Sequence, residues 1–265
     1  MTVLDRLRLD GKVALITGGG SGLGQAMALA MADAGAEIAV SGRRIEPLQE
    51  TQRLVQAKGR RCFVTQADVT DSAQVNRMIA EVIAHFGHLN VLVNNAGGGG
   101  AGRDKTLLEF TDEDWRQGID ANLSSTFYCC RAALPHFLER GSGRVINVSS
   151  GQAFRGQRHT FMYAAAKAGV VQFTRTLAIT YARDGIRATC IAPGWFQHFQ
   201  NPDEPSPRFA LQAAGRAGTT YEIGPLAVFL ASDASDYMSG QTVLLDGGAV
   251  AGGILPTSLA PTVEE

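Results

Sequence analysis

The sequence predicts an α/β protein in which helices cover both faces of one parallel sheet, a doubly wound architecture. Short β-rich apolar segments alternate with longer segments whose apolar residues recur every three or four positions, and this alternation is typical of a parallel sheet flanked by helices. Seven strands are expected, at residues 13–17, 37–41, 62–66, 89–94, 144–149, 188–192 and 242–245. Helices are expected at residues 23–34, 45–58, 72–86, 112–139, 163–183 and 221–231. Because no linker-like segment divides the chain, we expect residues 1–265 to form a single domain.

The composition indicates an ordinary globular protein with no excess of positive charge. The chain has 265 residues, 45% of them hydrophobic, and a formal net charge of −1. Nucleic-acid and anionic-membrane surfaces usually attract a basic excess, so neither partner is expected. No apolar run approaches the roughly 18 residues of a membrane span, and the N-terminal segment lacks the apolar centre of a signal peptide. We therefore expect a cytoplasmic protein.

The cysteines give no sign of a metal site or a disulfide framework. Cys62, Cys129, Cys130 and Cys190 lie inside apolar segments and show no C-x-x-C spacing. Cysteines in such surroundings usually act as small buried hydrophobic residues. We therefore expect four buried thiols and no bound metal.

A glycine-rich turn directly after the first expected strand is the strongest local motif. Gly18, Gly22 and Gly24 lie in the sequence TGGGSGLG, with Ser21 and Leu23 between them. Glycines let the backbone turn sharply against a flat anionic ligand, while the first N–H groups of the following helix point at its phosphates. The motif predicts a dinucleotide site in a Rossmann-type fold. A purely structural turn is the alternative that the motif alone leaves open.

The end of the second expected strand bears on the choice of coenzyme. Sites for NAD place an acidic residue there to bind the ribose 2′-hydroxyl, whereas arginine accommodates the 2′-phosphate of NADP. Here Gly42 stands where the acid is expected, and Arg43 beside Ser41 can make charge-assisted bonds to a phosphate. NADP(H) is therefore predicted, with Arg44 as the lesser contact. The alternative is that both arginines are solvated at a helix start.

A second motif joins a tyrosine and a lysine on one expected helix. Tyr163 and Lys167 are four positions apart, so they share a helix face. A cation at about 5 Å favours the phenolate by roughly 3 kcal/mol at an effective dielectric constant of ~20. This predicts a pKa of Tyr163 about two units below its usual value of about 10, towards the range for proton exchange near neutrality.

Two further polar residues have positions that suit catalysis. Ser150 follows the strand expected at 144–149, where a hydroxyl can donate to a substrate carbonyl, and Ser149 is the competing candidate. Asn122 lies within the long helix expected at 112–139. Asparagine is a poor helix former whose amide competes for backbone bonds, so Asn122 is expected to distort that helix and to hold a water.

Taken together, these motifs resemble the short-chain dehydrogenase/reductase family over residues 9–248. The resemblance rests on the glycine turn, on the sequence NNAG at 94–97, and on Asn122, Ser150, Tyr163 with Lys167, and Pro193-Gly194. It implies that Tyr163 is the general acid/base and that Ser150 orients and polarises the carbonyl. It further implies that Lys167 binds the nicotinamide ribose and lowers the tyrosine pKa, and that Asn122 anchors a water of the proton relay.

The resemblance also implies cofactor contacts and an activity. Ala96, Gly97 and Asn95, the expected hydrogen-bonding member, would line the cofactor site, and the pair Asp68-Val69 would contact the adenine. The implied reaction is hydride transfer between NADP(H) and a carbonyl or secondary alcohol. Look-alikes are 3-oxoacyl-thioester reductases and sugar-acid or polyol dehydrogenases. An NAD-linked polyol or sugar-acid dehydrogenase is one alternative, and a non-catalytic NADP-binding regulatory protein is an alternative of another class.

The segment 193–218 is rich in proline and polar residues and is expected to form a substrate lid. Trp195 and Phe196 at its start suit an apolar substrate wall, or simply core packing. His198 stands where the family often has a threonine that contacts the nicotinamide carboxamide. It is expected to face substrate or cofactor, with a solvated position as the alternative.

Residues between Ser150 and Tyr163 are expected to line the other side of the substrate mouth. Phe154 and His159 are the candidates for this wall, and Arg155 and Arg158 nearby indicate an anionic or polar substrate.

Two expectations concern assembly. The helices expected at 112–139 and 163–183 carry more apolar surface than one sheet face needs, including Phe127 and Phe173. The resemblance implies that such helices pair between subunits, so a homotetramer is expected, with a dimer as the alternative. The tail 249–265 is expected to pack across a subunit interface, or else to be a solvated end.

Overall fold

The computed structural model describes residues 2–98, 105–197 and 213–252, and these residues form the expected doubly wound architecture. Seven parallel strands make one sheet in the order β3-β2-β1-β4-β5-β6-β9. The strands are β1 (Val13–Thr17), β2 (Glu37–Gly42), β3 (Cys62–Gln66), β4 (Val91–Asn94), β5 (Gly143–Val148), β6 (Ile186–Pro193) and β9 (Thr242–Leu245). All seven were predicted, and three have the predicted bounds.

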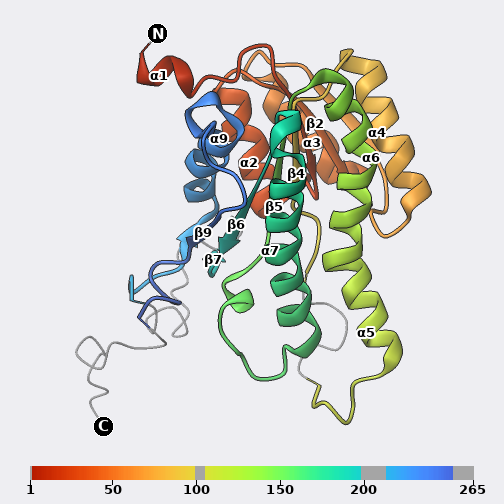
Figure 1. The fold of residues 1–265 in the computed structure, drawn as a ribbon, viewed down its shortest axis with the longest axis vertical. Helices are drawn as coiled ribbons and strands as arrows, with labels where there is room; N and C mark the ends of the chain where they lie inside the picture. The colour runs from red at the N-terminus through yellow and green to blue at the C-terminus, as the bar shows by residue number, and fades with distance from the viewer. Residues whose placement is uncertain (1, 99–104, 198–212, 253–265) are drawn as a thin grey trace.

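Helices cover both faces of this sheet (Figure 1). The helices are α1 (Val3–Arg6), α2 (Gly22–Asp33), α3 (Ile45–Gln56), α4 (Ser72–Phe86), α5 (Asp112–Ile119), α6 (Ser125–Arg140), α7 (Phe161–Tyr181) and α9 (Gly224–Ala231). One hydrophobic core joins the sheet to α2, α3 and α9. A second core joins the opposite face to α4, α6 and α7.

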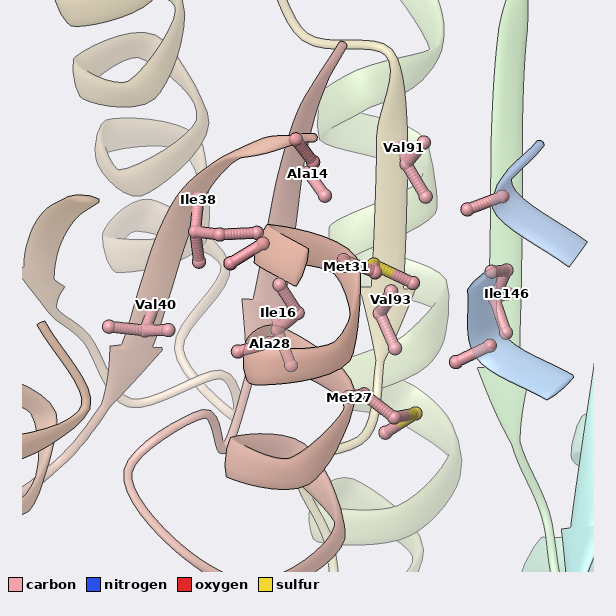
Figure 2. Close-up of a cluster of buried hydrophobic side chains, with 14 of the residues drawn as sticks. Ala14, Ile16, Met27, Ala28, Met31, Ile38, Val40, Val91, Val93 and Ile146 are labelled. Carbon is pink, nitrogen blue, oxygen red and sulfur yellow. The ribbon is translucent and has the colours of Figure 1, made fainter. Parts of the chain in front are cut away.

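The strands are apolar runs because both of their faces are buried. Every residue of β1 and of β5 is buried. Figure 2 shows Met27 and Met31 of α2 lying over Ile16 and Val93 of the sheet, and all four side chains are fully buried. The sheet is therefore rigid, and the residues at its carboxyl edge are held in fixed positions.

The helix expected at 112–139 is interrupted at the point where Asn122 was expected to distort it. A π-helical segment, Asp120–Ser124, separates α5 from α6. The side-chain amide of Asn122 donates to the carbonyl of Gly118 at 3.0 Å. Such a bond competes with regular helical pairing, and π segments accommodate the extra residue.

Other boundaries differ for local reasons. The helix expected at 221–231 begins instead with a 3₁₀ turn, Thr220–Ile223, before α9. Thr219 and Glu222 form a capping box that starts the chain turning one residue early. A pair of two-residue strands, β7 (Phe196–Gln197) and β8 (Gly218–Thr219), was not predicted.

The strand order places a switch point between β1 and β4. The chain continues from β1 towards β2 and β3 on one side, and from β4 towards β5, β6 and β9 on the other. Ligands of such sheets bind in the crevice outside the carboxyl ends of the strands at this point. Within the described residues, no helix is both long and apolar enough to cross a membrane.

Candidate active site

A cavity of about 910 Å³ opens at the carboxyl ends of the strands, at the switch point. Most of the predicted cofactor and catalytic residues line it. They are Gly18, Ser21, Gly22, Leu23, Arg43, Asp68, Val69, Asn95, Ala96, Gly97, Ser150, Tyr163, Lys167, Pro193 and Gly194. The cavity therefore has a glycine-turn end and a Tyr163 end, and the fold brings the two predicted sites together in one space.

Other predicted residues are not among those lining the cavity. They are Gly24, Ser41, Arg44, Asn122, Phe154, His159, Trp195 and Phe196. His198, the middle of the expected lid and the tail after residue 252 lie outside the described residues, so the expectations for them stay predictions.

One part of the cavity wall, formed by residues at the end of α5 and the start of the π segment, was not predicted from the sequence. Gln117, Gly118, Asp120 and Ala121 line the cavity. Asp120 accepts a hydrogen bond from the hydroxyl of Ser124 at 2.9 Å, so its carboxylate is oriented within the π segment. The available signal was its position two residues before Asn122, which the sequence had marked as a catalytic candidate.

The glycine turn fits a dinucleotide on steric grounds. Gly18 has a φ of +66°, and a Cβ there would lie 2.9 Å from the amide nitrogen of Asn95. A Cβ at Gly24 would lie 2.2 Å from the carbonyl oxygen of Gly18, so α2 can only approach the turn this closely with glycine at that position. The side chain of Ser21, the N-cap of α2, makes no capping bond. The first N–H groups of α2 therefore face the cavity without a side-chain cap, as anion binding requires.

Thr17 joins this turn to the one after β4, a role that sequence reasoning did not assign. Its hydroxyl oxygen accepts hydrogen bonds from the backbone N–H groups of Asn95 at 3.0 Å and Ala96 at 3.1 Å. The side-chain amide of Asn95 donates in return to the carbonyl of Thr17 at 3.0 Å. Asn95 is thus a hydrogen-bonding member of its motif, and its amide is used to hold the two walls of the cavity together.

Thr51 fixes the glycine turn from behind and was also missed. Its fully buried hydroxyl donates to the carbonyl of Gly19 at 2.9 Å and accepts from the amide of Gln25 at 2.9 Å. The signal in the sequence is a threonine in the otherwise apolar stripe of α3, between Leu48 and Val55.

The residues expected to choose the coenzyme separate into two groups. Arg43 is exposed at the cavity rim, and it has no carboxylate partner within the described residues. Its carbonyl accepts a hydrogen bond from the amide of Gln66 at 2.8 Å, which fixes the backbone from which the guanidinium extends. The hydroxyl of Ser41, by contrast, is fully buried and unpaired, and Arg44 is exposed as the N-cap of α3.

Asn122 acts in this structure as a clamp. Its side chain is fully buried, its Oδ1 accepts from the backbone N–H of Gly98 at 2.9 Å, and its Nδ2 donates to the carbonyl of Gly98 at 2.8 Å. With the further bond to Gly118, both amide hydrogens are used. The side-chain amide is therefore not free to donate to the water that sequence reasoning expected it to hold.

The two serines at the end of β5 have different roles. The hydroxyl of Ser149 is buried and donates to the carbonyl of Lys167 at 2.7 Å. Both serines line the cavity, and it is the Ser150 hydroxyl that makes a hydrogen bond with the Tyr163 side chain. Of the two candidates, Ser150 is thus the one placed beside the phenol.

Burial controls the charges of the Tyr163 and Lys167 pair. Lys167 is 4% exposed, its ammonium donates to the carbonyl of Val148 at 3.0 Å, and it lies 5.7 Å from the centre of the Tyr163 ring. Desolvation lowers the pKa of Lys167 to about 8. It also raises the pKa of Tyr163, which the hydrogen bond with Ser150 pulls down only in part.

The expected lowering of the Tyr163 pKa is therefore wrong for this structure. The sequence argument counted the attraction between the ammonium and the phenolate and left out the loss of hydration of both groups. In a buried pair, desolvation disfavours each charged form, and here it is the largest cause of both shifts.

The described residues expected around the substrate are not among those that line the cavity. Phe154 is 40% exposed, and Phe196 packs against a core cluster, which favours the core-packing alternative for Phe196. His159 has a φ of +60°, and its ring nitrogen Nδ1 lies 3.2 Å from the carbonyl of Lys105. Trp195 accepts a hydrogen bond from the N–H of Gly218 at 2.9 Å through its carbonyl.

Comparison with known proteins agrees with this geometry. Residues 12–204 match the family described as short chain dehydrogenase. The chain is 38% identical over 257 residues to a 2-dehydro-3-deoxy-D-gluconate 5-dehydrogenase of Escherichia coli, which covers 94% of this chain and 99% of that protein. It is 37% identical over 243 residues to a 3-oxoacyl-(acyl-carrier-protein) reductase of Staphylococcus aureus, covering 89% and 97% of the two chains.

A solved structure gives the same result. The gluconate 5-dehydrogenase of Burkholderia cenocepacia, in complex with NADP and tartrate, matches with a TM-score of 0.86 and 37% identity over 94% of this chain and 99% of that one. The chain belongs to the short-chain dehydrogenase family. It is an NAD(P)-dependent oxidoreductase that acts on a carbonyl or an alcohol.

The burial of Lys167 predicts a specific pH dependence of stability. Its pKa is about 8 in the folded protein and about 10.4 in an unfolded chain. Between these values the unfolded chain binds more protons than the folded protein, so the cost of burying the ammonium disappears as pH rises. Compared with Lys167→Met, the wild type should gain up to about 3 kcal/mol of unfolding free energy between pH 8 and pH 10.4.

Chemical denaturation of both proteins at several pH values measures this difference. Other titrating groups cancel in the comparison because the two proteins share them. A difference that stays constant from pH 7 to pH 10.4 would show that Lys167 is not desolvated in the folded protein.

Proposed function

We propose that this protein is an NADP(H)-dependent oxidoreductase that transfers hydride between the nicotinamide and a carbonyl or secondary alcohol through Tyr163, Lys167 and Ser150. The observation that carries the proposal is the shared cavity, in which a glycine turn shaped for a dinucleotide faces a hydrogen-bonded tyrosine and serine. A non-catalytic NADP-binding protein would have no need of that pair.

Each residue of the Tyr163 end has a role that its position allows. When bound, the nicotinamide supplies or accepts the hydride at the substrate carbon. The Tyr163 hydroxyl gives a proton to the substrate oxygen during carbonyl reduction and takes it back during alcohol oxidation. Ser150 donates a hydrogen bond to the same oxygen, which stabilises its developing negative charge. Lys167 holds an ammonium beside the phenol and offers donors to ribose hydroxyls.

The substrate that we favour is a sugar acid or a related hydroxy acid. Two of the relatives above act on such acids by name, and one was solved with tartrate. Arg155 and Arg158, between Ser150 and Tyr163, have no carboxylate partner within the described residues, so their charges are available to an anion. An oxoacyl thioester is the second candidate, because the Staphylococcus aureus relative is a reductase of that class. The predicted cytoplasmic location stays a prediction.

Replacing the phenol tests the mechanism. Tyr163→Phe removes the proton donor and keeps the ring, so turnover should fall by at least ~10²-fold. The dissociation constant of the coenzyme should change little, because the glycine turn is untouched. Initial rates and fluorescence titration with NADPH measure the two quantities. Turnover close to that of the wild type would refute the assigned acid/base role.

Replacing Arg43 tests the choice of coenzyme. If its guanidinium holds the 2′-phosphate, Arg43→Ala should weaken NADP(H) binding by about 1.5–3 kcal/mol, the range for hydrogen bonds to a charged group. Binding of NAD(H) should be unaffected, and Arg44→Ala is the matched control with a smaller loss. Equal losses for both coenzymes would assign Arg43 to the fold instead. A wild type that prefers NAD(H) would refute the coenzyme proposal itself.

We also propose that the protein is a homotetramer, with a dimer as the second candidate. Apolar side chains are exposed along the helices expected to pair: Phe127 of α6 is 40% exposed and Ile179 of α7 is 80% exposed. Phe127 also contacts Phe173 edge to face, with ring centres 6.4 Å apart, so the two helices present one continuous surface. Light scattering at micromolar concentration should report four subunits. A monomer under these conditions would contradict the assembly.

A further inference from the structure

The segment directly after β9 folds into a compact turn, residues 246–252, around the side chain of Asp246. Its Oδ1 accepts a hydrogen bond from the backbone N–H of Gly248 at 3.0 Å, and its Oδ2 accepts one from Val250 at 2.8 Å. Gly247 and Gly248 both have left-handed backbone angles, with φ of 61° and 82°. A carboxylate followed by two glycines thus encodes this turn, because glycine adopts such angles without steric cost.

This turn lies directly behind the Ser150 segment. Ser150 is the N-cap of a short 3₁₀ helix, Gly151–Ala153, and its hydroxyl accepts from the N–H of Gln152 at 3.2 Å. A Cβ built at Gly151 would lie 3.5 Å from Cγ2 of Val250, which is ordinary van der Waals contact. The Val250 side chain therefore lies beside the residue next to Ser150.

The same turn supports the wall after β6. The N–H of Gly194, which lines the cavity, donates to the carbonyl of Leu245 at 2.9 Å. A Cβ at Gly194 would lie 2.6 Å from Cα of Asp246, so the two backbones are packed as closely as glycine permits.

A third contact ties the turn to residues 213–218. The N–H of Ala214 donates to the carbonyl of Gly247 at 3.0 Å. A Cβ at Gly248 would meet the Cβ of Ala213 at 3.1 Å. One turn thus contacts the segments that carry Ser150, Gly194 and β8, although Asp246 itself is not among the residues that line the cavity.

We propose that Asp246 is a positioning residue of the active site, which acts by folding the 246–252 turn so that Val250 holds the Ser150 hydroxyl against Tyr163. The proposal rests on the function proposed above, because it matters only if Ser150 and Tyr163 carry out the chemistry. Without the carboxylate, the backbone N–H groups of Gly248 and Val250 lose their hydrogen-bond acceptors. The turn is then no longer fixed in the conformation that places Val250 beside Gly151.

The readout is the pH profile of alcohol oxidation, because a merely structural role would not move it. The hydrogen bond with Ser150 holds the pKa of Tyr163 down, and oxidation needs the phenolate. Asp246→Ala should therefore shift the pH of half-maximal kcat upward by about half a unit or more, as loss of a hydrogen bond to the charged form does. At pH 7 a smaller fraction of Tyr163 is then ionised, so kcat for oxidation should fall several-fold, in proportion to that fraction.

Companion variants separate positioning from folding. Asp246→Asn keeps one acceptor oxygen and should give an intermediate shift. Val250→Ala leaves the carboxylate in place and removes the side chain that lies beside Gly151, so it should move the profile in the same direction. Asp71→Ala is the matched control: its carboxylate accepts from the N–H groups of Ala73 at 2.8 Å and Gln74 at 3.2 Å at the start of α4, outside the cavity lining.

The expected result is an upward shift in Asp246→Ala and Val250→Ala with the wild-type profile in Asp71→Ala, even where Asp71→Ala lowers the melting temperature. Wild-type profiles in both Asp246→Ala and Val250→Ala would overturn the proposal. If Asp246→Ala does not fold, Val250→Ala decides alone. A wild-type protein without turnover on any carbonyl or alcohol would overturn the proposed function instead, so the two failures are distinguishable.

Discussion

The geometry of the site depends on the hydrogen bonds of one side chain, the hydroxyl of Thr17 at the carboxyl end of β1. It accepts hydrogen bonds from the backbone N–H groups of Asn95 and Ala96 after β4, and it donates one to the carbonyl of Val93 at 3.3 Å. Because β1 and β4 lead away from each other at the switch point, nothing in the sheet ladder itself holds their following turns together. This buried hydroxyl does so together with the side-chain amide of Asn95, which donates to the carbonyls of Thr17 and Gly18. The glycine turn and the NNAG segment therefore face one cavity at a fixed separation.

Three loops beside the cavity are held by residues that do not line it. Thr51 fixes the glycine turn from α3, Asn122 clamps Gly98 from the π segment, and Asp246 folds the turn behind Ser150. In each case a side-chain oxygen makes a hydrogen bond with a backbone group of a loop. Rigid placement of reacting groups requires such support, since loops at a sheet edge have few backbone bonds of their own.

Burial rather than simple attraction sets the resting charge of the Tyr163 and Lys167 pair. The phenol and the ammonium lie close to each other, yet both lose hydration, so the pKa of the tyrosine rises and that of the lysine falls to about 8. The hydrogen bond with Ser150 is the remaining force in this structure that favours the phenolate. Small displacements of Ser150 therefore matter more here than they would beside a solvated tyrosine.

The sequence alone determined the architecture and the two ends of the cavity. Strand and helix periods, the glycine spacing and the Tyr163 to Lys167 spacing are local properties, so the seven strands and the residues from Gly18 to Lys167 could be placed from the chain. Only the tertiary structure decided what depends on segments distant in sequence. It separated Ser150 from Ser149, buried Ser41, brought Asp120 and Gln117 to the wall, and placed Val250 behind Gly151. The burial of a residue and its contacts across the fold depend on many segments that are distant in sequence. A local sequence pattern therefore cannot predict them.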